Sequence, residues 1–340
     1  MTDAQTSGQQ NKQGHLLPRF ALFFCLAVLL ALVNSCANIA KVSDESIPKL
    51  ASPLASASFD SLIGQLQTFN QVQALRTSRA TIQFLDAASA ERYRTADASI
   101  VMQRPDKIRL VIQVPTVGTR VAEMVSDSKN FKVAIYTPAK YRRFLVGTND
   151  ADYSAWREKL DKKQEQQSAL INARPFHFTD ALLIRPLHLD DTKYVYSLSE
   201  ELVDEPDTRS GAKRESRVLR SYYVIAESQL LPDASGRAQV RRRFWFNRSD
   251  QIRLARQEVF DDKTQLVTEV RYTNYIKLSA ESNDLRPGVV TVLRPRDGYS
   301  AKISFLQESV EINPEDLPPT AFTLENKDQL PVTDLDKTAP

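Results

Sequence analysis

The chain has 340 residues, and its 45 lysines and arginines against 42 aspartates and glutamates give a formal net charge of +3. This small, well-mixed charge gives little support for nucleic-acid binding, and no G-x-G-x-x-G or G-x-x-x-x-G-K-S/T motif for cradling phosphates occurs. Because Cys25 and Cys36 are the only cysteines, the chain beyond residue 36 forms neither an internal disulfide nor a cysteine metal cluster.

The N-terminal segment is organised as a secretory signal. A polar leader with Arg19 precedes an uncharged apolar run over residues 20–33, which is shorter than the roughly 20 residues that span a bilayer. The run ends in Val33-Asn34-Ser35-Cys36, which resembles the lipobox of bacterial lipoproteins. The resemblance implies that residues 1–35 are a signal peptide and that Cys36 carries the lipid, including palmitate; Asn34 departs from the usual small residue. An uncleaved single-span anchor and ordinary secretion are the alternatives.

Residues 36–58 are rich in Ala, Ser and Pro, which predicts a flexible tether. Helical spacing of Leu62, Leu66 and Phe69 then predicts an amphipathic helix from Phe59 that packs on a sheet. The polar end over residues 327–340 predicts a disordered tail, so one folded domain is expected over 59–326.

Two runs of β-strands are predicted, and the clearest period-two pattern is that of Ile108, Leu110 and Ile112. The first run comprises strands over 79–84, 92–103, 107–114, 120–126, 131–135 and 141–146. The second run comprises strands over 193–198, 219–226, 238–246, 251–260, 265–277, 289–293 and 301–312, with a mobile charged loop over 199–217.

Helices are predicted between the two runs, over 151–172 and 178–183. Hairpin-linked strands curl because open edges are a liability, and helices between two strand runs cover one face of the sheet. The sequence therefore predicts a mostly β, α+β fold: an incomplete antiparallel β-barrel with helices as a lid over the concave face.

Residues 104–133 read R-P-D-K-I-R-L-V-I-Q-V-P-T-V-G-T-R-V-A-E-M-V-S-D-S-K-N-F-K-V. This stretch resembles the LolA/LolB-like lipoprotein carriers, through an R-P-x-K-I-R strand, a loop with Pro and Gly, and a strand ending in Ser-Asp; Ser128 stands where a turn glycine is common. The resemblance implies an apolar cavity that binds acyl chains of lipids or lipoproteins, and it brings no catalytic residues. Val117 is the nearest candidate for the exposed apolar loop residue of LolB-like proteins; an ordinary turn is the alternative.

The inward-facing apolar side chains of both strand runs are the expected lining of the cavity, although a solid barrel core has the same pattern. The candidates are Met102, Ile108, Leu110, Ile112, Phe131, Val133, Ile135, Tyr222, Val224, Phe244, Phe246, Ile252 and Leu254.

Few residues suggest covalent chemistry. His177 and His188 are spaced too widely for a helical metal pair, and no G-x-S-x-G elbow occurs. We therefore expect no metal, no cofactor and no enzymatic activity. Residues 241–243, three arginines beside Phe-Trp-Phe, suggest either an anionic-lipid contact or, preferably, an edge strand protected by charge.

The sequence thus predicts a lipid-anchored lipoprotein of the cell envelope that faces the periplasm and binds acyl chains in transport or insertion. Ala37, rather than Asp, follows Cys36, which by resemblance to lipoprotein sorting favours the outer membrane. Its expected partners are the membrane, acyl chains and envelope proteins, without nucleic acid. The alternative is a structural or signalling lipoprotein with a solid barrel that binds proteins at its edges or charged loop.

Overall fold

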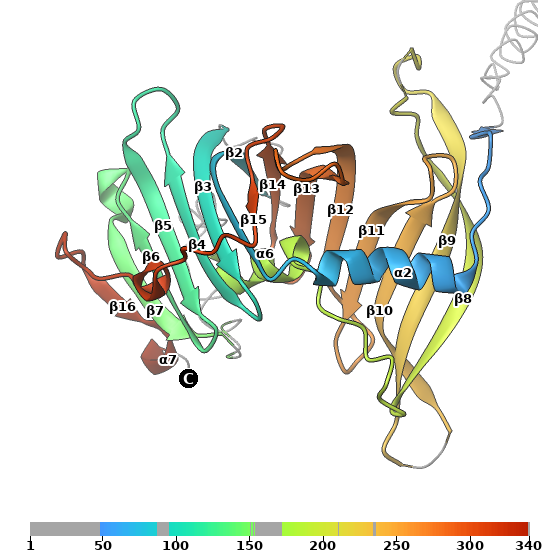
Figure 1. Ribbon diagram of the computed structural model, residues 1–340. Helices are drawn as coiled ribbons and strands as arrows, with labels where there is room; N and C mark the ends of the chain where they lie inside the picture. Colours follow the sequence, from blue (N-terminus) through green and yellow to red (C-terminus); the bar gives the residue numbers. More distant parts are fainter. Residues whose placement is uncertain are drawn as a thin grey trace, which may run out of the picture. The chain divides into compact units, whose positions relative to one another are not determined.

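The computed structural model describes residues 48–86, 95–149, 151, 153, 172–209, 211–233 and 236–338 (Figure 1). Residues 49–340 form one compact unit. Within the described ranges, no helix is long and apolar enough to cross a membrane. The predicted signal peptide, Cys36 and most of the helix predicted over 151–172 lie outside the described residues.

The first strand run is an antiparallel meander in which each strand pairs with the next. Side-chain alternation sets its two faces: Ile108, Leu110 and Ile112 are buried, whereas Lys107 and Arg109 between them are only partly buried. The strands are β2 (Ala74–Asp86), β3 (Ala96–Gln103), β4 (Lys107–Gln113), β5 (Arg120–Asp127), β6 (Asn130–Ile135) and β7 (Arg143–Thr148), with a 3₁₀ turn, η1 (Ala139–Tyr141), before β7.

The second strand run is a longer meander. Its strands are β8 (Tyr194–Pro206), β9 (Arg217–Leu230), β10 (Ala238–Asn247), β11 (Arg253–Phe260), β12 (Leu266–Lys277), β13 (Leu285–Arg294) and β14 (Tyr299–Phe305). The mobile loop predicted over 199–217 is wrong in large part, since β8 pairs with β9 as far as Pro206. An edge strand needs a partner on one side only and carries charge on its exposed positions, so its sequence looks like a loop.

The pairing of β14 with β2 joins the two runs into one sheet. The strand order is β1-β9-β10-β11-β12-β13-β14-β2-β3-β4-β5-β6-β7-β16, where β1 is Lys49–Leu50 and β16 is Val332–Asp334. Strand β8 pairs with β9, and β15 (Glu311–Ile312) pairs with β2. The sheet does not close on itself, because no pairing joins β8 to β7 or β16 among the described strands. The predicted fold class, a mostly β incomplete antiparallel barrel, is therefore confirmed.

Two helices pack on one face of this sheet (Figure 1). Helix α2 (Phe59–Asn70) is capped by Ser58, whose side chain accepts a hydrogen bond from the backbone N–H of Ser61, and it buries Leu62, Ile63 and Leu66. Helix α6 (Pro175–Leu182) begins with a proline, which suits the first helical turn, and it buries Phe178 and Ala181. We call the face that these helices cover the inner face.

Both ends of the described chain add short strands to the sheet. Strand β1 (Lys49–Leu50), inside the segment predicted as a tether, pairs in parallel with β9. Strand β16 (Val332–Asp334) and helix α7 (Leu335–Thr338) lie in the segment predicted as a disordered tail, and β16 pairs in parallel with β7. The 3₁₀ turn η2 (Pro319–Phe322) and the chain after it place Phe322, Leu324 and Leu330 against Val125 and Phe144 on the outer face. Both segments differ from the predictions. Strand pairing at a sheet edge uses backbone N–H and C=O groups, so a polar or proline-rich segment can form it without apolar side chains.

Candidate functional site

The inner face of the sheet is a continuous apolar surface contributed by both strand runs. Strand alternation predicts this surface, and the structure gathers there most of the expected cavity residues, each no more than 7% exposed. Those on the inner face are Met102, Ile108, Leu110, Ile112, Phe131, Val133, Ile135, Phe244, Phe246, Ile252 and Leu254.

Tyr222 and Val224, which were expected to line the same cavity, instead pack with Trp245 in a separate cluster on the outer face. Their neighbours Tyr223 and Ile225 occupy the inner face. Both faces of β9 are buried at these positions, so hydrophobic periodicity does not show which set of alternating residues faces inward.

A small apolar pocket of about 40 Å³ lies where α2 and α6 meet the sheet. Its walls come from the end of α2, from α6 and from strands β2, β12, β13 and β14, and they include Phe69, Val72, Leu182, Val290 and Phe305. A volume of this size holds only a few atoms. A longer apolar chain could enter this pocket only if one of the covering helices moved.

Arg104, in the turn between β3 and β4, holds the ends of both helices. Its guanidinium donates to the carbonyls of Val72 (2.8 Å) and Phe69 (3.2 Å) at the end of α2. It also donates to the carbonyls of Leu183 (3.3 Å) and Ile184 (2.9 Å) after α6. The last carbonyls of a helix have no partner within the helix, and a cation is favourable there. Burial, and the nearby Arg185, lower the pKa of Arg104, yet an arginine remains protonated.

Two further arginines support this arrangement. Arg286 of β13 donates to the carbonyl of Thr68 (3.1 Å) and lies over the ring of Phe69. Arg185 pairs with Asp180 of α6 (2.6 Å) and with Asp106 of the β3–β4 turn (2.9 Å). Sequence reasoning used Arg104 as part of a motif but missed its role, since its partners lie up to 80 residues away.

The two histidines contact different residues. His177 of α6 is buried, and its Nδ1 lies 2.6 Å from the hydroxyl of Tyr299. Burial raises the pKa of the Tyr299 hydroxyl. His188 stacks on Tyr194 and lies 3.4 Å from Glu227. The described residues contain no cluster of His, Cys, Asp and Glu suited to a metal ion.

The arginines at 241–243 lie on β10, which is flanked by β9 and β11, so the expectation of an edge strand is wrong. Arg242 makes two 2.7 Å hydrogen bonds to Glu227 and donates to two backbone carbonyls. Burial opposes ionisation of Glu227, but hydrogen bonds from Arg242 and Tyr196 hold the pKa of its carboxyl below the ordinary value. Arg241 pairs with Asp262, and Arg243 lies over Phe260.

Val117 lies in the loop between β4 and β5 and is 73% exposed. The loop turns at Thr116 and Gly118, which both have positive φ. The structure thus places an exposed apolar side chain at the predicted position, while its role stays a prediction.

No family model and no curated protein matches this sequence. Three solved structures to which the chain is similar are the following. A LolA superfamily protein from Nitrosomonas europaea is 14% identical, with 81% of this chain and 100% of that chain covered and a TM-score of 0.40. A DUF1329 family protein from Desulfovibrio piger is 15% identical (77% and 94% covered, TM-score 0.40). A putative outer membrane lipoprotein-sorting protein domain from Vibrio parahaemolyticus is 13% identical (79% and 96% covered, TM-score 0.37).

Proposed function

We propose that this chain is a lipid-anchored protein of the bacterial cell envelope that binds acyl chains of lipids or lipoproteins beneath α2 and α6, in transport or insertion. The observation that carries the proposal is the Arg104 clamp, by which one guanidinium holds the ends of both helices over an apolar face. Binding is non-covalent in this proposal and uses no catalytic residue.

Burial of an acyl chain supplies a driving force for such a mechanism. Burying about ten methylenes of an acyl chain is worth about 8 kcal/mol, at about 0.8 kcal/mol per methylene. Releasing α2 from Arg104 breaks the hydrogen bonds to Val72 and Phe69, which costs about 1.5 kcal/mol because these carbonyls are partly accessible to water. The acyl chain must also replace the contacts of Leu62, Ile63 and Leu66, which α2 buries, so its burial opposes both costs.

Cys36 is the proposed lipid-attachment residue, and Ala37 after it supports the outer membrane as the site of anchoring, with the folded domain facing the periplasm. Mass spectrometry of the chain isolated from bacterial membranes tests this part. A diacylglyceryl adduct is expected on Cys36 and is lost in C36S.

Acyl-chain binding is tested by native mass spectrometry of the full chain in a nonionic detergent, offered a phospholipid or a diacylated peptide. We expect a one-to-one adduct. Val290 lines the apolar pocket and Val224 lies in the outer-face cluster, and both are 2% exposed, so V290F and V224F form a matched pair. V290F should abolish the adduct and V224F should retain it, while circular dichroism confirms that both fold. A wild-type chain that takes up no lipid, or a V290F chain that binds as well as wild type, would refute the proposal.

One observation favours protein binding as the second candidate function. In the described chain β8 pairs only with β9, and Val195, Leu198 and Leu202 are exposed along it. An edge strand with exposed apolar side chains can pair with an extended segment of another protein. If no lipid adduct forms, loss of a partner protein from pull-downs with L202E, but not with the loop variant V117E, would support this candidate.

A further inference from the structure

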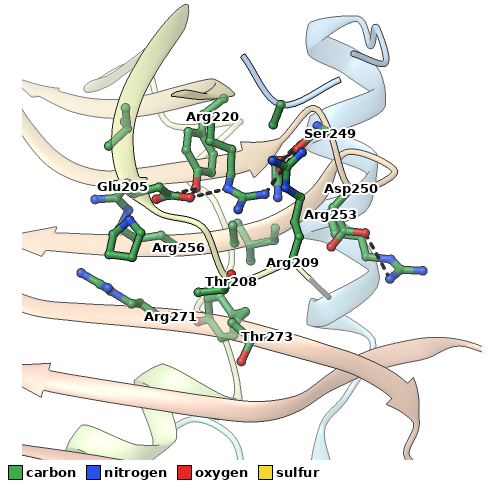
Figure 2. Close-up of a pocket in the computed structure, with 18 of the residues that line it drawn as sticks. Glu205, Thr208, Arg209, Arg220, Ser249, Asp250, Arg253, Arg256, Arg271 and Thr273 are labelled. Carbon is green, nitrogen blue, oxygen red and sulfur yellow. Dashed lines mark hydrogen bonds and ion pairs between the residues drawn. The ribbon is translucent and has the colours of Figure 1, made fainter. Parts of the chain in front are cut away.

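An open pocket of about 960 Å³ lies on the outer face of the second strand run (Figure 2). It is bounded by the ends of β8 and β9, by the turn between β10 and β11, and by β11 and β12. Its lining includes five arginines and three carboxylates, together with the hydroxyls of Thr208, Ser249 and Thr273. The arginines, which define what we call the arginine pocket, are Arg209, Arg220, Arg253, Arg256 and Arg271.

The charges on β11 and β12 are segregated by sign. Arg256 lies directly opposite Arg271 in the strand register, and Glu258 lies directly opposite Glu269. Like charges directly opposite each other are destabilising, and alternating them across the strands would have removed the repulsion. The arrangement instead places both arginines at the pocket, whereas neither glutamate lines it. A bound anion would offset the repulsion between the two arginines.

Both arginines keep hydrogen-bond donors available in the described structure. Arg256 packs its guanidinium 4.0 Å from the centre of the Trp245 ring and lies 3.6 Å from Glu258, without a hydrogen bond to any described residue. Arg271 donates from Nε to Glu269 (2.5 Å), and its side chain is 64% exposed. Planar guanidinium groups held in this way are suited to binding the oxygens of a phosphate in pairs.

The opposite wall of the pocket is already neutralised. Arg220 pairs with Glu205 (Figure 2). The hydroxyl of Tyr222 lies 3.0 Å and 3.1 Å from the two oxygens of the same carboxylate. Arg209 pairs with Asp207 outside the pocket lining (2.7 Å). Arg253 lies 3.6 Å from Asp250. All five arginines therefore have an acidic partner within 4.0 Å. Arg256 and Arg271 are distinguished by facing each other across the strands and by the donors that they keep for a further anion.

We propose that the arginine pocket binds a phosphate-bearing ligand, whose phosphate lies between Arg256 and Arg271. A phosphate has enough oxygens to accept hydrogen bonds from both guanidinium groups at once, whereas a carboxylate has only two. The pocket is large enough for more than the phosphate, since ligand pockets have volumes of about 300 to 1,000 Å³. The ligand is therefore either a soluble phosphate ester or the headgroup of a phospholipid. This site is separate from the apolar pocket of the inner face.

Isothermal titration calorimetry on the full chain in a nonionic detergent tests the proposal. The probes are inorganic phosphate, sn-glycerol 3-phosphate and dihexanoyl phosphatidylglycerol, with acetate at equal ionic strength as the carboxylate control. We expect saturable one-to-one binding of the phosphate probes and none of acetate. R271Q and R256Q should each weaken binding about tenfold or more, whereas R214Q, at a 96% exposed side chain outside the pocket, should leave it unchanged.

Each result either supports or overturns the site. Binding of dihexanoyl phosphatidylglycerol at least about tenfold tighter than that of glycerol 3-phosphate identifies a lipid headgroup, and equal binding identifies a soluble phosphate ester. No binding of any phosphate probe, equal binding of acetate, or unchanged binding in R271Q overturns the proposal. If R256Q fails to fold, R256K takes its place, and it should weaken binding by losing the planar fork. Lipid adducts at the inner face should persist in R271Q, so failure here is distinguishable from failure of acyl-chain binding.

Discussion

Replacing Arg104 with glutamine tests the clamp most directly. The change removes four hydrogen bonds, of 2.8 to 3.3 Å, from one guanidinium to the carbonyls that end α2 and α6. Hydrogen bonds to charged groups contribute about 1.5 to 3 kcal/mol each when they are buried. Because the freed carbonyls are partly accessible to water, we expect R104Q to lower the free energy of unfolding by about 3 kcal/mol rather than by the full sum.

Two measurements check this expectation. Urea denaturation gives the free energy of unfolding, and hydrogen exchange shows whether the amides of α2 and α6 open before the rest of the sheet. R185Q is the matched control, because Arg185 is 53% exposed and its ion pairs with Asp180 and Asp106 are worth at most about 1 kcal/mol. If R104Q loses no more stability than R185Q, or if α2 exchanges as slowly as in wild type, Arg104 does not hold the helices.

Further predictions concern the body of the sheet. E227Q leaves the buried Arg242 without its ion-pair partner, so unfolding experiments should show a loss of about 3 to 5 kcal/mol. The pKa of Glu227 is lowered in the folded state, so its contribution is present above its ordinary pKa and is lost as the pH falls through the folded-state pKa; acid-unfolding curves of E227Q should lack this component. G147A places a Cβ 2.7 Å from the hydroxyl of Tyr153, which should lower the melting temperature and cost about 1 to 3 kcal/mol. G64A, in α2 with nothing within 4 Å, should instead be neutral or stabilising by about 0.5 to 1 kcal/mol.

Much of the fold can be predicted from the sequence because most strands bury one face only. In β4 the buried positions 108, 110 and 112 alternate with partly exposed ones, and a period of two identifies such a strand and its inward side chains. The same rule fails for β9, where Tyr222, Tyr223, Val224 and Ile225 are all buried. A strand that is covered on both faces has no polar face, so the sequence does not show which of its alternating residues point inward.

The contacts that sequence reasoning missed are the ones made across long separations. The clamp joins Arg104 to carbonyls 32 to 80 residues away. Every residue has a backbone carbonyl, so the sequence does not indicate which carbonyls accept these hydrogen bonds. The register of Arg256 against Arg271 depends on an irregularity between Val259 and Phe260 in the pairing of β11 with β12, which changes which residues lie opposite each other. The hairpin turn alone does not reveal this irregularity.

The way in which α2 is held suggests how the inner face could open without unfolding the sheet. The sheet is joined by backbone hydrogen bonds along its strands, whereas the hydrogen bonds from the sheet to α2 in the described chain come from the side chains of Arg104 and Arg286. Helix α6 has an additional hydrogen bond to the sheet, because the hydroxyl of Tyr272 donates to the carbonyl of Ala181 (3.0 Å). Displacing α2 therefore breaks few bonds and leaves every strand pairing intact. The buried Leu62, Ile63 and Leu66 of α2 also leave the core, and the acyl chain replaces their contacts. Because this opening is local and leaves the sheet folded, α2 is the helix that we expect to move when an acyl chain binds.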